Sequence, residues 1–327
     1  MLRLLLPIFI TCTSAAVADV PRIATDIAPV QGLVAAVLGD LGDAALVVPK
    51  GTSPHDHALR PSEARQLQSA DLVVWIGPDL MPNLAKPLET LASTARILTL
   101  SDVPGSLLLS NRTAAVFALP DPDTSHPEAD HDHKDEAAEP RDTEAGSDHA
   151  HPVGGHDPHL WLDPGNALIW LDAIHAQLAD LDPEHAAAYA ENAARAKAAV
   201  TSAAEAARTR LAASAGRQYL SLHDAYQYFE HAFDLHPLGA VSLSDATSPG
   251  PSRLAALRDV MARSDVRCVL AEPGAALGFL TALDPASRLR VAEVDPMGAA
   301  IPPGPEFYPT LISDTADRIA DCLMTGS

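Results

Sequence analysis

The sequence predicts an α/β fold of two lobes, each built on a parallel sheet, joined by a long rigid helix. Two observations support this. Short runs rich in β-branched and apolar residues alternate with helical patterns, which is typical of parallel sheets covered by helices. The alternation occurs once before residue 101 and again after residue 216, and an Ala-rich stretch without Gly or Pro lies between. A chain of 327 residues is long enough for two domains of ordinary size.

The first lobe is expected over residues 19–182. Its predicted strands are 45–49, 70–77 and 95–100, and its predicted helices include 29–41 and 61–69. Pro61 suits a first helical turn, where the missing N–H costs nothing.

The second lobe is expected over residues 214–327. Strands are predicted at 217–223, 266–272 and 289–295, with helices at 252–263 and 308–324.

The linking helix is predicted over residues 183–213. Asp163 and Asp182 are each followed by Pro, the usual order of an N-cap and a first helical position. As one helix the stretch would be roughly 45 Å long, which suits a rigid connection between lobes. An ordinary surface helix of one lobe is the alternative.

The N-terminus is typical of a signal peptide over residues 1–18. Arg3 supplies the positive charge, residues 4–10 are apolar, and the A-V-A at 16–18 fits a cleavage site. The mature chain would begin near Asp19 and be exported in soluble form. Lipid anchoring through Cys12 is the weaker alternative, because the residues before it fit a lipobox poorly.

The charge balance disfavours nucleic acid as a partner. The chain has 43 acidic and 22 basic residues, a formal net charge of -21. Phosphate binding needs clustered Lys and Arg, whereas an acidic chain can attract cations.

Nearly half of that net charge lies in one segment, residues 121–157. It contains twelve Asp or Glu and six His, and almost no large apolar residue. We expect a solvated loop, since it cannot bury enough surface to offset its ordering entropy. Its composition indicates weak affinity for transition metals. The alternative is an acidic linker that happens to contain His.

Three further histidines are candidate metal ligands. His55 follows a predicted strand, His223 ends one, and His159 stands where the acidic loop returns to apolar sequence. Open α/β sheets place ligands at the carboxyl ends of their strands. Three neutral imidazoles could therefore meet around one Zn²⁺ at roughly 2.0–2.1 Å.

Two cysteines remain after removal of the signal peptide, Cys268 and Cys322. In an oxidising compartment such a pair is expected to form a disulfide, and two buried free thiols are the alternative.

Several motifs in order resemble a known family. They are S-P-H-D-H-A-L-R-P-S-E, A-D-L-V-V-W-I-G-P, H-L-W-L-D-P, L-H-D-A-Y-Q-Y-F-E, C-V-L-A-E-P and V-D-P-M-G. They resemble the metal-binding periplasmic solute-binding proteins of ABC transporters (cluster A-I), and within them the zinc-uptake branch. The resemblance implies two Rossmann-like α/β lobes, a long connecting helix and a metal site in the inter-lobe cleft. It also places Cys268 and Cys322 where a disulfide is expected.

The resemblance implies metal-ligand roles for His55, His159 and His223, with Asp295 of V-D-P-M-G as a fourth ligand. Some zinc members have Glu directly before the first His. Here Pro54 stands at that position, so the fourth ligand must be Asp295, a water or a loop His.

Other polar residues near these motifs remain open. His57 and His156 are minor competitors as ligands. Glu272 and Asp224 are candidates to orient an imidazole through its other nitrogen. For Glu272, helix capping or a salt bridge is an equal alternative.

The function implied by the resemblance is capture of Zn²⁺ in the periplasm and delivery to an inner-membrane permease of an ABC importer, without catalysis and as a monomer. An exported zinc-dependent hydrolase is one alternative, although the chain has no H-E-x-x-H motif. A metal buffer acting through the His-rich loop is another.

Overall fold

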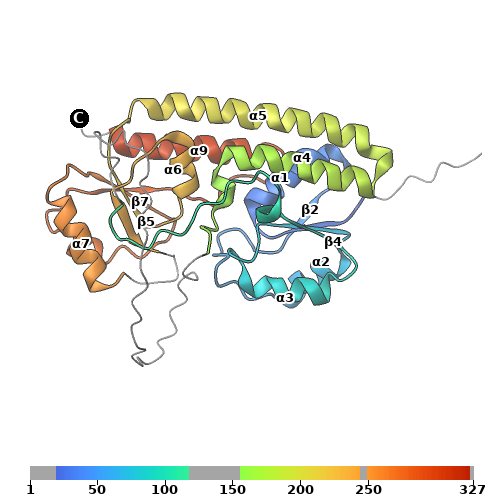
Figure 1. Ribbon diagram of the computed structural model, residues 1–327, viewed down its shortest axis with the longest axis horizontal. Coiled ribbons are helices and arrows are strands. Elements are labelled where there is room, and N and C mark those ends of the chain that lie inside the picture. Colours follow the sequence, from blue (N-terminus) through green and yellow to red (C-terminus); the bar gives the residue numbers. More distant parts are fainter. Residues whose placement is uncertain (1–19, 118–154, 244–248, 325–327) are drawn as a thin grey trace, which may run out of the picture.

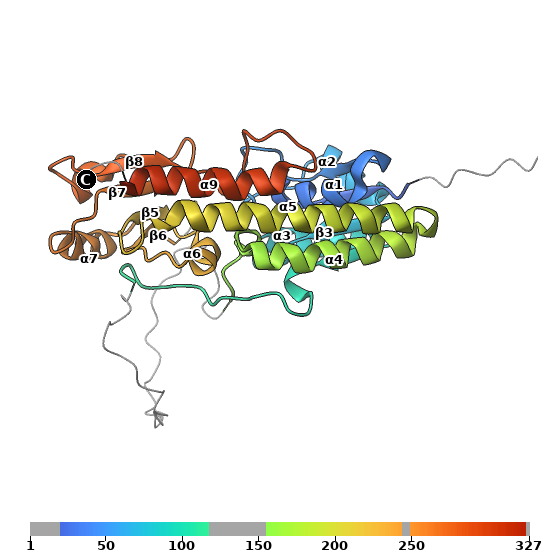
Figure 2. The ribbon, with the colours of Figure 1, turned by 90° about the horizontal axis from the view of Figure 1, so that it is seen from above.

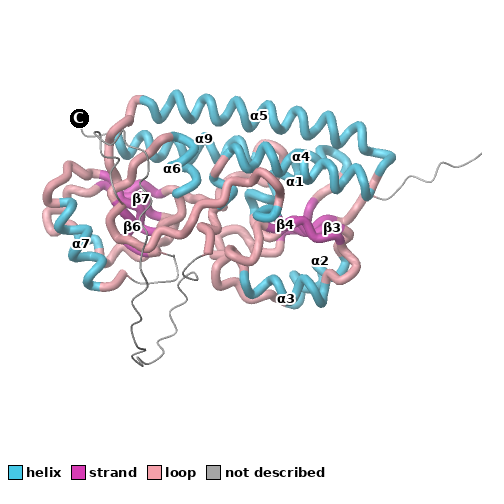
Figure 3. The backbone as a smooth tube through the Cα atoms, in the orientation of Figure 1, coloured by secondary structure: helices cyan, strands magenta, loops and turns pink. Residues whose placement is uncertain are grey.

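Two parallel sheets form the framework of the protein, as predicted. The computed structural model describes residues 20–117, 155–243 and 249–324, and in these ranges each sheet has four strands. The strand orders are β2-β1-β3-β4 and β6-β5-β7-β8, and every pairing is parallel. The sheets lie at opposite ends of the molecule (Figures 1 and 3).

The strands are short. Their bounds are β1 Ile23–Thr25, β2 Ala44–Leu46, β3 Leu72–Trp75, β4 Arg96–Thr99, β5 Leu220–His223, β6 Gly239–Ser242, β7 Cys268–Ala271 and β8 Arg290–Glu293. Two of them, β1 and β6, were missed by the sequence analysis. Strand β1 has only three residues, and β6 is a Gly-Ala-Val-Ser run of mostly small side chains, so neither has a pattern that stands out as a strand.

Helices and strands alternate along the chain within each half, as the sequence predicts. Their bounds are α1 Ala28–Leu38, α2 Pro61–Ser69, α3 Pro82–Leu91, α4 Pro164–Leu181, α5 Ala186–Ala212, α6 Gln227–Phe233, α7 Pro251–Met261, α8 Leu280–Leu283 and α9 Phe307–Met324. Helix α2 has the predicted bounds, with Pro61 in its first turn. Among the described helices, none combines the length and the apolar character that crossing a membrane requires.

The long helix α5 begins later than predicted. Residues 183–185 form a 3₁₀ turn, and the α-helix starts at Ala186. Asp182 does not cap a backbone amide; its Oδ2 accepts hydrogen bonds from the His185 ring at 2.7 Å and from the Tyr189 hydroxyl at 2.8 Å. Asp163, in contrast, caps α4 as predicted by accepting from the Gly165 N–H.

Helix α5 is not an isolated rod, because it packs against α1, α4 and α9. Figure 2 shows α9 lying alongside the C-terminal part of α5. Helix α9 also reaches both halves: Phe307 at its start packs against Gly32 of α1, and Cys322 near its end is bonded to Cys268 of β7. The disulfide prediction is thereby confirmed.

Two predicted segments fall outside the described residues. They are the signal peptide at 1–18 and all but the end of the acidic loop at 121–157, of which residues 155–157 are described. The division into lobes at residues 182 and 213 stays a prediction.

Candidate metal centre

Three imidazoles meet between the two halves of the molecule. The rings of His55, His159 and His223 lie with centroids 4.9 to 5.6 Å apart, mutually tilted by 65 to 76°. Each offers a ring nitrogen, and these three atoms all lie within 4.8 Å of one another. Ligand atoms of a tetrahedral zinc site are about 3.4 Å apart, given metal–nitrogen bonds of 2.0–2.1 Å. A small contraction would therefore bring the three nitrogens onto one ion.

The fold supplies the three side chains from separate places. His55 lies in the loop between β2 and α2, His223 is the last residue of β5, and His159 precedes the 3₁₀ turn that leads into α4. Carboxyl ends of parallel strands face the same edge of a sheet, so both sheets direct their ligand-bearing loops at the space between them.

The rings line a pocket of ≈ 410 Å³ that both halves enclose. Its remaining wall includes the loop at 51–54, the segment 272–276 and Asp295. His159 and His223 are almost fully buried there. Low solvent access strengthens any charge interaction inside such a pocket.

Two of the imidazoles are oriented by carboxylates. Glu272 Oε1 lies 2.7 Å from Nδ1 of His223, and Asp157 Oδ1 lies 2.7 Å from Nδ1 of His159. Asp157 also accepts from the His159 backbone N–H at 2.9 Å. A carboxylate accepts a hydrogen bond from Nδ1–H, which leaves Nε2 as the ligand atom. Both rings are therefore held in the tautomer that binds a cation.

Sequence reasoning anticipated one of these two carboxylates. Glu272 was a candidate, but Asp157 was counted with the acidic loop. The signal was present as D-P-H, an Asp two residues before a ligand, and was hidden by the acidic residues preceding it. Asp224, the other candidate, does not orient an imidazole through an observed hydrogen bond. It pairs with Arg112, and burial raises its pKa even beside that guanidinium.

Asp295 lines the same pocket but lies outside the cluster of three nitrogens. Its Oδ1 accepts from the Met297 N–H at 2.8 Å, and its Oδ2 accepts from the Ala299 N–H at 2.6 Å. Each carboxylate oxygen has a second lone pair, so a ligand role for Asp295 stays a prediction.

The two minor competitors lie elsewhere. His57 is buried against α2, with Nε2 2.9 Å from Glu63 Oε2. His156 is half-exposed, with Nδ1 3.5 Å from Asp79. Neither belongs to the group of three, which is the one His, Cys, Asp or Glu group of this geometry in the part of the chain that the structure describes.

The fold and the site define a class: a two-sheet α/β protein with a long connecting helix that presents an imidazole triad for one cation. The chain belongs to the family of the zinc-uptake complex component A, periplasmic (ZnuA), whose model matches residues 23–322. That family comprises components of an uptake complex rather than enzymes, which agrees with binding without catalysis.

Individual relatives agree with this family assignment. The chain is 36% identical to a high-affinity zinc uptake system protein ZnuA of Paracoccus denitrificans, with 96% of this chain and 95% of the relative covered. It is 31% identical to the ZnuA of Brucella abortus, over 95% and 94% of the two chains. A crystal structure of ZnuA shares the fold, with a TM-score of 0.71 at 19% identity, covering 93% of this chain and 100% of that one.

Proposed function

We propose that this protein captures Zn²⁺ in the periplasm and delivers it to the inner-membrane permease of an ABC importer. The observation that carries the proposal is the convergence of three imidazole nitrogens within 4.8 Å in a pocket between the two sheets. Imidazole suits zinc, and relatives 31 to 36% identical over nearly the whole chain are named as zinc uptake proteins.

The ligand set of the proposal is His55, His159 and His223, with Asp295 as the fourth ligand. Asp295 is the carboxylate of the pocket wall that no imidazole uses in the described contacts. Three imidazoles and one carboxylate close a tetrahedral site, whereas zinc catalysis keeps an open position for water. The zinc is therefore cargo.

The remaining parts of the proposal concern the cell. A signal peptide at residues 1–18 directs export of the chain and is then cleaved. The mature protein acts as a monomer and has no nucleic-acid partner. The motif at the N-terminus supports the export, and the acidic charge disfavours nucleic acid as a partner.

Isothermal titration with Zn²⁺ tests the site. We expect His55→Ala, His159→Ala and His223→Ala each to weaken zinc affinity by about 100-fold or more, because losing a ligand costs more than losing the partner of a ligand. His236→Ala, a half-exposed His outside the pocket, serves as the control and should bind normally. Tight binding that survives removal of all three imidazoles would refute the proposal.

A further inference from the structure

Two chain segments form a pair of arms that leads into the metal centre. The outgoing arm, residues 109–117, and the returning arm, residues 155–158, run antiparallel. The Asp157 N–H donates to the Leu109 carbonyl at 2.8 Å, and the Asn111 N–H donates to the Gly155 carbonyl at 3.2 Å. Because His159 directly follows the returning arm, the pairing with the outgoing arm determines where that ligand lies.

The far end of the outgoing arm is attached to the second sheet. Phe117 N–H donates to the Leu238 carbonyl at 3.0 Å, and Ala240 N–H donates to the Ala115 carbonyl at 3.2 Å. The Arg253 guanidinium donates to the Ala114 carbonyl at 2.9 Å. The outgoing arm thus extends the sheet beside β6.

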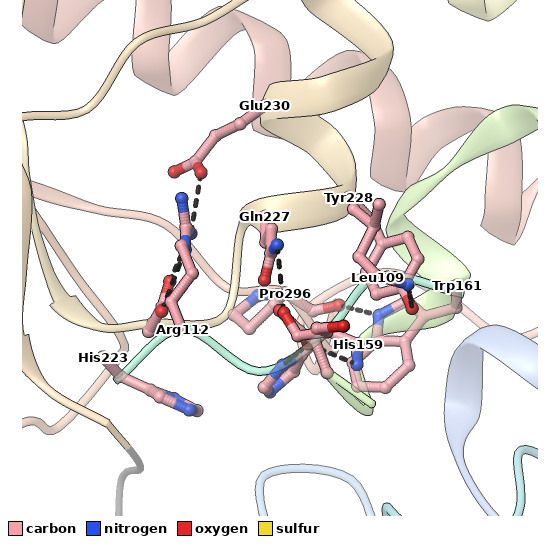
Figure 4. A network of polar contacts seen from close by, with 12 residues as sticks. Leu109, Arg112, His159, Trp161, His223, Gln227, Tyr228, Glu230 and Pro296 are labelled. Carbon is pink, nitrogen blue, oxygen red and sulfur yellow. Dashed lines mark hydrogen bonds and ion pairs between the residues drawn. The ribbon is translucent and has the colours of Figure 1, made fainter. Parts of the chain in front are cut away.

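Arg112 lies between these two attachments. Its Nε donates to Asp224 Oδ2 at 3.1 Å, and its Nη2 contacts both Asp224 Oδ1 and, at 2.8 Å, Glu230 Oε2 (Figure 4). Its Cζ lies 3.9 Å from the centre of the Phe117 ring. Both carboxylates are buried, and Asp224 directly follows His223.

We propose that Arg112 is a positioning residue of the metal centre, which fixes the arm that carries His159 against the turn that carries His223. The proposal rests on the proposed function, since it concerns the same site. A guanidinium forms two directed bonds to one carboxylate and so determines orientation as well as distance. Arg112 touches neither imidazole in the described contacts, and it acts through Asp224 and the paired arms.

Weaker contacts hold the same arm and keep it folded without Arg112. The Leu109 N–H donates to the Tyr228 hydroxyl at 2.9 Å, and Gln227 Nε2 donates to the Ser110 carbonyl at 3.3 Å (Figure 4). These neutral bonds attach the arm to α6, but they do not reach the turn at His223. Loss of Arg112 should therefore loosen the spacing of the two ligands while the arm stays in place.

The decisive variant is Arg112→Lys. It keeps the positive charge that Asp224 and Glu230 need, but an ammonium group cannot form the two directed hydrogen bonds of a guanidinium. We expect zinc affinity, measured by competition with a chelator, to fall about 10-fold, the lower end of the effect of outer partners of metal ligands. The ligand-field absorption of Co²⁺ bound in place of zinc should shift, because the ligand geometry changes. In metal-free protein, the His159 amide should exchange its hydrogen faster.

Arg210→Lys is the matched control. Arg210 joins α5 to Asp317 and Asp321 of α9 in a similar double contact away from the pocket. This variant should lower the melting temperature without changing zinc affinity or the Co²⁺ spectrum. A purely structural role for Arg112 predicts that Arg112→Lys behaves in the same way.

Several outcomes overturn the inference. One is a folded Arg112→Lys protein with wild-type zinc affinity and Co²⁺ spectrum. If that variant does not fold, the same measurements are made on the double variant Arg112→Gln/Asp224→Asn. If neither variant folds, Arg112 serves only the stability of the fold, and the inference is overturned. Failure of the proposed function would be seen separately, as wild-type protein and His55→Ala binding zinc equally. The amide exchange of metal-free protein does not depend on that result.

Discussion

At the scale of single residues, the centre depends on the carboxylates behind the imidazoles as much as on the rings. Glu272 holds Nδ1 of His223, and its negative charge makes the ring a stronger donor to a cation. We expect Glu272→Ala to weaken zinc affinity 10- to 100-fold. Glu272→Gln keeps a hydrogen-bond acceptor but loses the charge, so it should lose less zinc affinity than Glu272→Ala. Titration with zinc checks both, and exposed Glu89→Gln on α3 is the control. Wild-type affinity in Glu272→Ala would contradict the role.

Asp26 is a buried acid whose protonation links stability to pH. It accepts from the backbone N–H groups of Ile27 and Ile76, both at 2.7 Å, and burial raises its pKa from 3.8 to about 7. The folded state therefore holds this proton where the unfolded state has lost it. That contribution to stability is complete below pH 3.8 and disappears as the pH rises to about 7.

The loss over the whole window is up to about 4 kcal/mol, at 1.36 kcal/mol per pH unit, of which about 3 kcal/mol falls above pH 5. Urea unfolding of metal-free protein at pH 5 and pH 8 measures this last part, with Asp26→Asn as the comparison. The variant should show a smaller drop between the two pH values than the wild type. Equal drops would show that Asp26 does not titrate in this range.

The three histidines could be predicted because each one stands next to a strand end or an ordered motif. Asp157 could not be separated from eleven other acidic residues of its loop. Arg112 could not be predicted at all, because its partners Asp224 and Glu230 are more than 100 residues away in the sequence. Long-range pairing of this kind leaves no local pattern.

At the scale of elements, the attachment of the outgoing arm to β6 requires a glycine. A Cβ at Gly239 would stand 2.1 Å from the Ala115 carbonyl oxygen, a backbone atom that cannot move without moving the arm. We expect Gly239→Ala to lower the free energy of unfolding by about 1–3 kcal/mol, the usual cost of overpacking. Gly250→Ala is the control, because a Cβ there would meet nothing within 4 Å. Equal stability of the two variants in urea unfolding would show that the arm is loosely held.

The disulfide joins β7 to the last turns of α9 and closes a loop of 54 residues. In the chain-entropy model such a loop stabilises the folded state by about 4 kcal/mol. We expect the free energy of unfolding of the double variant Cys268→Ala/Cys322→Ala, measured with denaturant, to be lower than that of the wild type by about 4 kcal/mol. Wild type treated with reductant should lose a similar amount of stability. Zinc affinity should not change, because neither sulfur lines the pocket. A loss below about 1 kcal/mol would indicate that Arg217, which donates to the Leu323 carbonyl at 2.8 Å, already fixes this end of α9.

Elements were predictable where a pattern was long enough. The predicted and observed bounds of helix α2 agree to the residue. Strands β1 and β6 were missed, although both are buried in their sheets. Strand β1 is central in its sheet, so its stability comes from two neighbours that lie 21 and 49 residues further along the chain. Three residues carry too little periodicity to show this.

At the scale of the whole molecule, helices α5 and α9 connect the halves, and packing along their length explains how a pocket between two sheets can be preformed. The paired arms add a further connection on the side of the metal centre. The sequence analysis treated residues 121–157 as one loop, but in the structure residues 155–157 pair with the outgoing arm and Asp157 accepts from the ring of His159. Asp157 and the returning arm therefore belong with the metal centre rather than with the acidic loop.

The role of Asp157 distinguishes two deletions that look alike in the sequence. Replacing residues 121–153 by a short Gly-Ser linker removes most of the acidic and His residues of the loop but keeps Asp157 and the returning arm. We expect one tight zinc site to survive, with loss of weak sites in isothermal titration. Extending the deletion through Asp157 should weaken the remaining site a further 10- to 100-fold, because His159 loses its acceptor. If the shorter deletion abolished tight binding, the loop itself would be the functional metal site, and the protein would be a buffer rather than a carrier.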